Sequence, residues 1–270
     1  MNGNITNDRY GKEDVMKKLM MIVILVLLVS LFLDADVYMK TVETVKPFEM
    51  MGKKMPEQTE IRERWMGVDK FALQMKEYSI IIDEGKGKLF LIVHQPKIYF
   101  ELPTNITKEK ILELLVGLSP KAAEVISSMT ITDVKYSSGL ETKKIANWNC
   151  SSSELEMVIM ISAMNMMPKF KIKMWTTKDV PADYQKYTKV AEEFFVKYVL
   201  GMIKVDESSK KAMDKMSQSE GFEVATEITV NIFGSEIKME SQCLEVMEKP
   251  APPGTYSVPS GYTKKSIPLS

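Results

Sequence analysis

The stretch SIIIDEGKGKLFLIVHQPKIYFEL, residues 79–102, decides the fold class of this chain. Its apolar runs at 79–83, 88–94 and 98–102 have the length and the β-branched and aromatic content of strands. The connections EGKG and QPK are rich in turn residues and far too short for a parallel crossover. The stretch therefore predicts an antiparallel meander.

More strands are predicted on both sides of this meander. Upstream, Asp36–Val45 and Thr59–Met66 have strand composition, with Ile61 and Trp65 in phase on one face, and FALQM follows. Downstream strands are predicted at 130–137, 143–151, 154–163, 170–177, 222–234 and 235–246. Most of the chain is therefore expected to build an antiparallel sheet.

Two helical segments interrupt the strand pattern. Residues 108–128 place apolar side chains at helical spacing, and Gly117 and Pro120 divide them into a helix pair. Asp183–Ile203 is predicted to be an amphipathic helix, and the charged segment 205–221 after it is interpreted as a connection. The fold class expected is mainly β with α, or α+β.

The N-terminus carries an export pattern. Lys17 and Lys18 precede an apolar run from Leu19 to Leu33, which is shorter than the roughly 20 residues of a membrane-spanning helix. Cleavage is predicted after Ala35, with an uncleaved anchor as the alternative, because Leu33 breaks the small-x-small pattern. Since no cysteine follows the run, a lipidated N-terminus is not expected. Met16 begins a complete signal, so either it is the start or residues 1–15 lengthen the basic region.

Three segments follow from these patterns. Residues 1–35 are the N-terminal extension and signal, and residues 36–248 form a single domain. Residues 249–270 are a Pro-, Gly- and Ser-rich tail, expected to lie outside the core. The expected location is the periplasm or cell envelope, with secretion as the alternative. Contact with a membrane is expected only through an uncleaved signal.

Composition excludes some functions. The 36 basic and 36 acidic residues leave no net charge that would attract nucleic acid over long range. The unusual feature is the 22 methionines, which cluster at 50–55 and 157–167. Methionine either replaces leucine in a core or lines a surface that accepts varied apolar partners. The sequence leaves both interpretations open.

The two cysteines, Cys150 and Cys243, both lie in the exported part. In an oxidising compartment two such residues favour a disulfide, which is predicted here, with two unpaired buried thiols as the alternative.

No enzymatic set of residues is found. His94 is the only histidine, so the common zinc sites and His-centred triads cannot be assembled, and a structural role is expected for it. Carboxylate pairs such as Glu60 with Glu63, and Glu154 with Glu156, are typical of solvated strand faces. We therefore expect no catalytic residues, no metal, no cofactor and no enzyme activity.

Five segments carry a family resemblance: ADVYMK (35–40), the meander 79–103, IANWNCSSSELEM (145–157), IKMWTTKDVPADY (172–184) and PAPPGTYSVPSGYTKKS (250–266). Together they resemble an uncharacterised bacterial exported family, itself similar to the periplasmic lipoprotein carriers of the LolA and LolB kind. The resemblance implies a curved antiparallel sheet forming a half-open barrel, closed by helices, whose hollow shelters acyl chains in the carriers.

The expected function is non-enzymatic binding of lipid, acyl chains or another hydrophobic ligand on the concave side of the sheet. The residues expected to line that side are Trp65, Met157, Ile159, Ile161 and Phe195. The alternative is a structural module of the cell envelope, whose core is filled by its own side chains and whose partner is another envelope protein. The absence of void around these side chains would favour the alternative.

Overall fold

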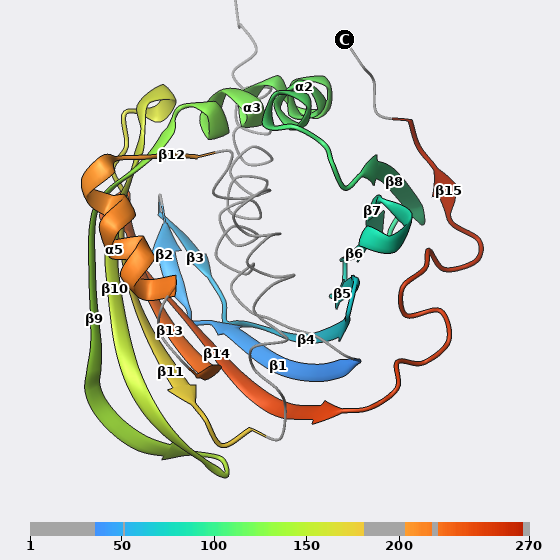
Figure 1. Cartoon of the computed structure of the whole chain (residues 1–270). Helices are drawn as coiled ribbons and strands as arrows, with labels where there is room; N and C mark the ends of the chain where they lie inside the picture. The colour runs from blue at the N-terminus through green and yellow to red at the C-terminus, as the bar shows by residue number, and fades with distance from the viewer. Residues whose placement is uncertain (1–35, 51, 181–202, 218–220, 267–270) are drawn as a thin grey trace, which may run out of the picture.

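The computed structural model describes residues 36–50, 52–180, 203–217 and 221–266. Within these residues, strands assemble into one thirteen-stranded sheet, in the order β12-β9-β10-β11-β13-β14-β1-β4-β5-β6-β7-β8-β15 (Figure 1). Neighbours are antiparallel except at the edges, where β12 and β15 pair in parallel with β9 and β8. The sheet curls strongly but is not closed into a barrel. The prediction of a mainly β fold with a large antiparallel sheet and few helices is confirmed.

The strands of the large sheet are β1 (Val37–Val45), β4 (Gln58–Gly67), β5 (Lys70–Gln74), β6 (Tyr78–Asp83), β7 (Lys88–Val93), β8 (Ile98–Pro103), β9 (Met129–Ile145), β10 (Trp148–Ile161), β11 (Lys169–Thr177), β12 (Lys204–Val205), β13 (Phe222–Ile232), β14 (Ser235–Glu248) and β15 (Thr263–Lys264). A separate hairpin consists of β2 (Phe48–Met50) and β3 (Lys53–Met55). The described helices are α2 (Lys108–Leu118), α3 (Pro120–Ser127) and α5 (Glu207–Ser217), with single 3-10 turns η1 (Glu84–Lys86) and η2 (Ser162–Met164).

The predicted meander is present as β4 to β8. Its turn at η1 is fixed locally, because the Asp83 side chain accepts a hydrogen bond from the Lys86 amide and Gly87 adopts a left-handed φ of 63°. The cis Gln95–Pro96 bond lies in the next connection. Sequence and structure therefore agree throughout residues 58–103.

The long β9–β10 hairpin differs from the sequence expectation. Residues 143–151 were expected to form one strand, but the chain turns back within them, and Ile145 pairs with Trp148. Ala146 adopts a left-handed φ of 51° in this turn. Because alanine rarely takes that conformation, the sequence gives little sign of the turn, and its β-rich composition favours continuous strand.

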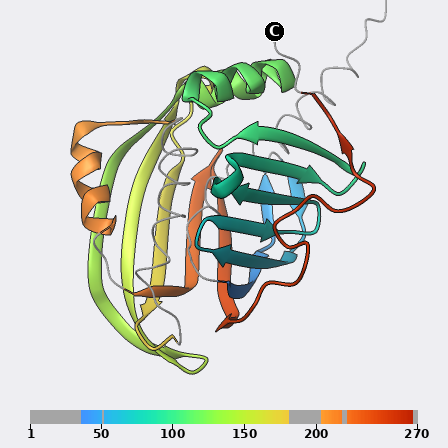
Figure 2. The ribbon, with the colours of Figure 1, turned by 45° about the vertical axis from the view of Figure 1, so that its right-hand side comes forward.

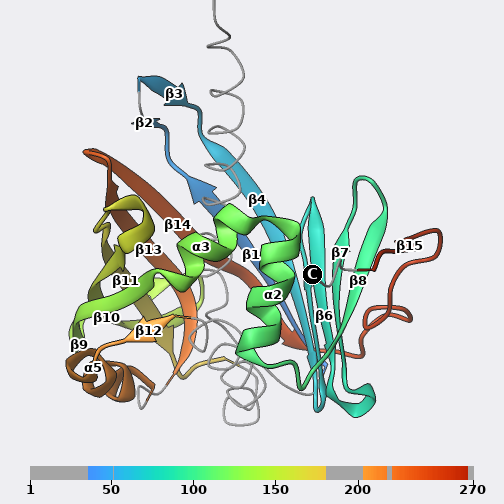
Figure 3. The ribbon, with the colours of Figure 1, turned by 90° about the horizontal axis from the view of Figure 1, so that it is seen from above.

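The helix pair is confirmed as α2 and α3. Ser119 caps α3 by accepting a hydrogen bond from the Ala122 amide, and Pro120 occupies the first turn. The two helices lie across the open side of the curved sheet (Figures 1 and 3). Helices α2 and α3 therefore cover part of the open side of the sheet. The predicted helix at 183–203 lies outside the described residues, apart from Ile203, which is buried.

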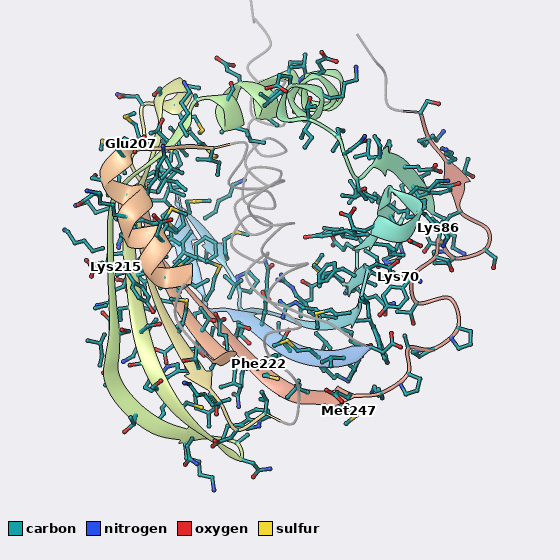
Figure 4. The ribbon with its side chains drawn as sticks, viewed as in Figure 1. Lys70, Lys86, Glu207, Lys215, Phe222 and Met247 are labelled. Carbon is teal, nitrogen blue, oxygen red and sulfur yellow. The ribbon has the colours of Figure 1, made fainter. Side chains whose placement is uncertain are left out.

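Helix α5 was not expected, because residues 205–221 were interpreted as a charged connection. Glu207 and Lys215 lie near its two ends (Figure 4), and it packs against β9. The Asp206 carboxylate accepts a hydrogen bond of 2.7 Å from the Ser209 amide, and this bond supports the first turn. An aspartate three residues before such an amide is the sequence signal that could have indicated the helix.

The C-terminal tail packs on the sheet, although nearly all of its described residues are exposed or only partly buried. It runs over the outer side of the meander and ends in β15 (Figure 2). Tyr256, Val258 and Tyr262 contact an apolar cluster built on Tyr38 and Trp65. Proline and glycine do not prevent this, since an extended segment can lie flat on an apolar sheet face. The tail therefore covers the convex face of the meander.

Candidate functional site: the concave face of the sheet

The two faces of the sheet can be assigned from the tail. Because side chains alternate along a strand, Trp65 under the tail is on the convex face, whereas Arg64 and Met66 are on the concave face. Directly paired residues share a face, so the assignment extends through the register from strand to strand. The concave face carries a methionine cluster and, beside it, a polar cluster.

The methionine cluster is apolar and unusually rich in sulfur. Two of its methionines are buried and five are only partly buried. Its methionines are Met50, Met55, Met129, Met157, Met164, Met166 and Met239, and its buried floor includes Phe48, Val125, Ile131, Ile159, Ile161, Phe170, Ile203, Val230 and Ile237. Flexible thioether side chains that are partly accessible can adapt to apolar partners of different shape.

The register explains why these residues meet. Met157 on β10 pairs with Phe170 on β11, Phe170 pairs with Val230 on β13, and Val230 pairs with Ile237 on β14. Four neighbouring strands thus place a continuous apolar row on one face. Ile159 and Ile161 continue the face toward β9, where they pair with Ile131 and Met129.

The structure brings three of the five predicted lining residues together. Met157, Ile159 and Ile161 belong to the methionine cluster, and a ligand-binding role for them stays a prediction. Trp65 does not join them, and its prediction as a lining residue of the concave face is wrong, since it packs on the convex face against Tyr38, with ring centroids 4.7 Å apart. Phe195 lies outside the described residues.

The polar cluster lies beside the apolar one, on β1, β4 and β13. It consists of Thr41, Glu43, Glu60, Arg62, Arg64, Glu223 and Thr226. Arg62 is its most fully paired member, because its guanidinium lies 2.5 Å from a Glu43 carboxylate oxygen and 3.3 Å from one of Glu60. Its side chain is only 4% exposed, so these charge-assisted bonds compensate its removal from water.

Arg64 is buried with poorer partners. Its side chain is 3% exposed, its Nη1 donates to the Met39 sulfur at 3.5 Å, and its Nη2 lies 3.9 Å from Glu43. A thioether is a weak acceptor. Burial, opposed by Glu43, lowers the pKa of Arg64. Burial likewise raises the pKa of Glu43, against the effect of Arg62.

Glu223 is a buried carboxyl group near this arginine. Burial raises its pKa to about 7, although the hydrogen bond from Thr226 and the charge of Arg64 act in the opposite direction. It is therefore partly protonated near neutral pH. The chain thus holds an ionisable group that changes charge in the physiological range on its concave face.

Sequence patterns did not indicate this polar cluster. Glu60 was expected on a solvated face and instead pairs with buried Arg62, while Glu63 pairs with Lys40 at 3.7 Å. The pair Glu154 and Glu156 does lie on a partly solvated face, where Lys171 bridges both carboxylates. The available signal was the alternation of Glu60, Arg62 and Arg64 in TEIRERWM.

The disulfide predicted between Cys150 and Cys243 is not present. Both residues are free, buried thiols on β10 and β14, strands that β11 and β13 separate. Three strand spacings amount to about 14 Å, well beyond the roughly 7 Å limit between the Cα atoms of a disulfide. Spacing in the sequence gave no information on the two strands between them.

His94 has the structural role that was expected. One ring nitrogen lies 2.9 Å from the Ser79 hydroxyl and the other lies 2.7 Å from the Tyr262 hydroxyl. Ser79 is buried within β6, and Tyr262 belongs to the tail. The histidine therefore joins the tail to the convex face of the meander.

A polar pocket of about 500 Å³ lies at the far end of the β9–β10 hairpin. Its lining includes Lys143, Lys144, Asn149, Cys150 and Asp179. Asp179 is engaged, since one of its carboxylate oxygens accepts from both the backbone and the side-chain amide of Asn149. Its lining residues are mostly of polar types, unlike those of the methionine cluster.

The described residues lack two other features. There, no group of three or more histidine, cysteine, aspartate or glutamate side chains is placed to hold a metal ion. No described helix has the length and apolarity to cross a membrane.

Comparisons with known proteins include a remote structural likeness. No protein-family model and no curated protein sequence matches the chain. One solved structure, titled a "putative outer membrane lipoprotein-sorting protein domain" from Vibrio parahaemolyticus, is 7% identical with a TM-score of 0.24 and covers 78% of this chain and 84% of that chain. A TM-score of 0.24 is too low to establish a common fold, so the resemblance to lipoprotein carriers stays a sequence-based expectation.

Proposed function

We propose that the protein is an exported, non-enzymatic binder of a lipid, an acyl chain or another flexible hydrophobic ligand, held at the methionine cluster. The observation that carries the proposal is the set of five partly buried methionines beside a buried apolar floor on the concave face. Partly accessible methionines can repack around chains of different length at little cost.

The contrast between the two faces supports this assignment. On β11, Phe170 and Ile172 are buried on the concave face, whereas Lys171 is exposed on the convex face and pairs with Glu154. The convex face of these strands is thus polar and exposed to solvent. The concave face carries the apolar surface that a hydrophobic ligand requires.

Two further observations favour a binder over an enzyme. The only histidine is engaged with Ser79 and Tyr262 on the convex face, away from the methionine cluster. The signal pattern at residues 16–35 supports export, where a carrier of water-insoluble molecules would be needed.

The test is the affinity of the full chain for dodecanol, a neutral ligand with a flexible apolar chain, measured by isothermal titration calorimetry. We expect saturable binding that Met157→Gln weakens by about tenfold, because losing about 50 Å² of apolar contact costs about 1 kcal/mol. The matched control is Met247→Gln, since Met247 is also partly buried but lies in the convex cluster.

Equal loss in both variants would indicate general destabilisation and contradict the assignment of the site. No saturable binding by the unmodified chain would overturn the proposed function. It would favour the alternative, an envelope protein with a side-chain-filled core and a protein partner.

A further inference from the structure

The polar cluster holds a buried cation, Arg64, that has few hydrogen-bond partners. A guanidinium offers five N–H donors, and among the described residues those of Arg64 reach only the Met39 sulfur at 3.5 Å. Its distance of 3.9 Å to Glu43 is too long for a hydrogen bond. With a side chain only 3% exposed, Arg64 has little contact with water, so an acceptor that reached its remaining donors would stabilise its charge.

The neighbouring carboxylates do not supply that acceptor. Glu43 forms its short ion pair, 2.5 Å, with Arg62 and not with Arg64. Glu60 also forms its ion pair with Arg62. Glu223 is partly neutral near pH 7, because burial raises its pKa to about 7. The positive charge of Arg64 is therefore incompletely balanced.

A second unsatisfied group lies on the same face. The Thr41 hydroxyl is buried, with the residue 1% exposed, and it has no hydrogen-bond partner among the described atoms. Thr41 pairs with Arg62 and Met39 pairs with Arg64, so Thr41 and Arg64 are diagonal neighbours, about 7 Å apart. One small anion between them could accept from both side chains.

The polar cluster adjoins the methionine cluster. Thr226, which donates to Glu223, pairs with Ser241, and the next pair on this face joins Ile228 to Met239 of the methionine cluster. Two residues along a strand correspond to about 7 Å. Arg64 lies farther along, because its partner Met39 and the partner of Met239, Val45, are six residues apart on β1, about 20 Å. A long alkyl chain whose head group is held at Arg64 would therefore run past Glu43 to reach the methionine cluster.

We infer that the polar cluster binds the carboxylate of a long-chain monocarboxylate, with Arg64 and Thr41 as donors and the alkyl chain lying on the methionine cluster. The inference rests on the proposed function and specifies the chemical class of the ligand's head group. A carboxylate matches the fork of a guanidinium and brings a single negative charge. A phosphate brings a charge of about −1.5 to −2 at neutral pH, which the nearby Glu43, Glu60 and Glu223 disfavour.

Entry of the ligand requires an opening of this face, because Arg64 is only 3% exposed in the unliganded chain. The association rate is therefore expected to be slower than that of a ligand meeting a preformed surface.

The test compares dodecanoate, dodecanol and dodecyl phosphate on the full chain, by calorimetry at pH 7.5 and below their micelle-forming concentrations. We expect dodecanoate to bind at least tenfold more tightly than either of the others. If dodecanol binds as tightly as dodecanoate, or dodecyl phosphate binds more tightly, the inference is overturned while the proposed function stands. If none binds, the proposed function fails as well.

Variants locate the head group. Arg64→Met should lower the affinity for dodecanoate at least tenfold and leave that for dodecanol unchanged, so that dodecanol binding also reports a folded protein. Thr41→Val is the second variant and keeps the shape of the side chain. It should lower the affinity for dodecanoate by about threefold and leave the affinity for dodecanol unchanged. The control Lys171→Met removes a convex-face cation and should change neither affinity. Unchanged dodecanoate affinity in both test variants would contradict the inference.

Discussion

Replacing Glu223 with glutamine tests the description of the concave face without any ligand. Glu223 is buried and its pKa is raised from 4.5 to about 7, chiefly by burial. The folded state therefore holds this proton more tightly than the unfolded state does. Stability contributed by the protonated group is fully present below about pH 4.5 and is lost as the pH rises through 7.

The magnitude follows from the pKa. At about 1.4 kcal/mol for each tenfold change in proton affinity, the difference between 4.5 and about 7 amounts to about 3 kcal/mol. Glutamine imitates the protonated carboxyl, has no charge to lose, and can still accept the hydrogen bond from Thr226. We expect Glu223→Gln to match the unmodified chain near pH 5 and to exceed its stability by about 3 kcal/mol at pH 8.5.

The assay is denaturant unfolding of the full chain at both pH values, followed by the fluorescence of its tryptophans. The comparison is the difference between variant and unmodified protein, in which other titrating groups cancel. Glu236→Gln on β14 is the control, because the exposed carboxylate of Glu236 pairs with exposed Lys238. This substitution should change stability by less than about 0.5 kcal/mol at either pH. A Glu223→Gln difference that does not grow with pH would refute the reasoning.

Three further predictions concern other parts of the fold. Trp65→Ala should cost about 3–5 kcal/mol of unfolding free energy, because Trp65 is 5% exposed under the tail, and should leave dodecanol affinity unchanged. Two free thiols should titrate in denaturant without reductant, whereas in the folded protein at pH 8 they should react slowly, since burial raises the pKa of Cys150 and brings that of Cys243 to about 12. Ser119→Ala should cost about 1 kcal/mol by removing the cap of α3, measurable by denaturant unfolding.

Local sequence patterns were sufficient to predict the meander and the helix pair. Short turns with Asp83 and Gly87 fix the register between β6 and β7, and Pro120 marks the start of α3. These signals are contained in a few neighbouring residues. Turns that use residues outside their usual preferences, such as Ala146, leave no comparable trace.

The faces of β4 were assigned wrongly for a physical reason. Ile61 and Trp65 alternate with Arg62 and Arg64, and apolar residues normally face the core. Here the tail covers the Trp65 face, so both faces of the strand are removed from water near that residue. Alternation then no longer indicates which face is concave, and only the tertiary position of the tail does.

The methionine cluster was predicted in part, because Met157, Ile159 and Ile161 are adjacent in one apolar strand. The polar cluster could not be assembled in the same way, since Glu43, Arg64 and Glu223 come from three strands far apart in the sequence. Pairings of β1 with β4 and β14, and of β14 with β13, bring those strands together. Such long-range pairing is not encoded in local periodicity.

The most direct test of ligand binding on the concave face is the NMR spectrum of the full chain with ¹³C-labelled methionine methyl groups, titrated with dodecanoate. Binding at the methionine cluster predicts saturable shifts of the resonances of Met157 and Met239, assigned by substitution, while that of Met247 in the convex cluster stays in place. Unchanged resonances for Met157 and Met239 at saturating ligand, or shifts confined to Met247, would contradict it.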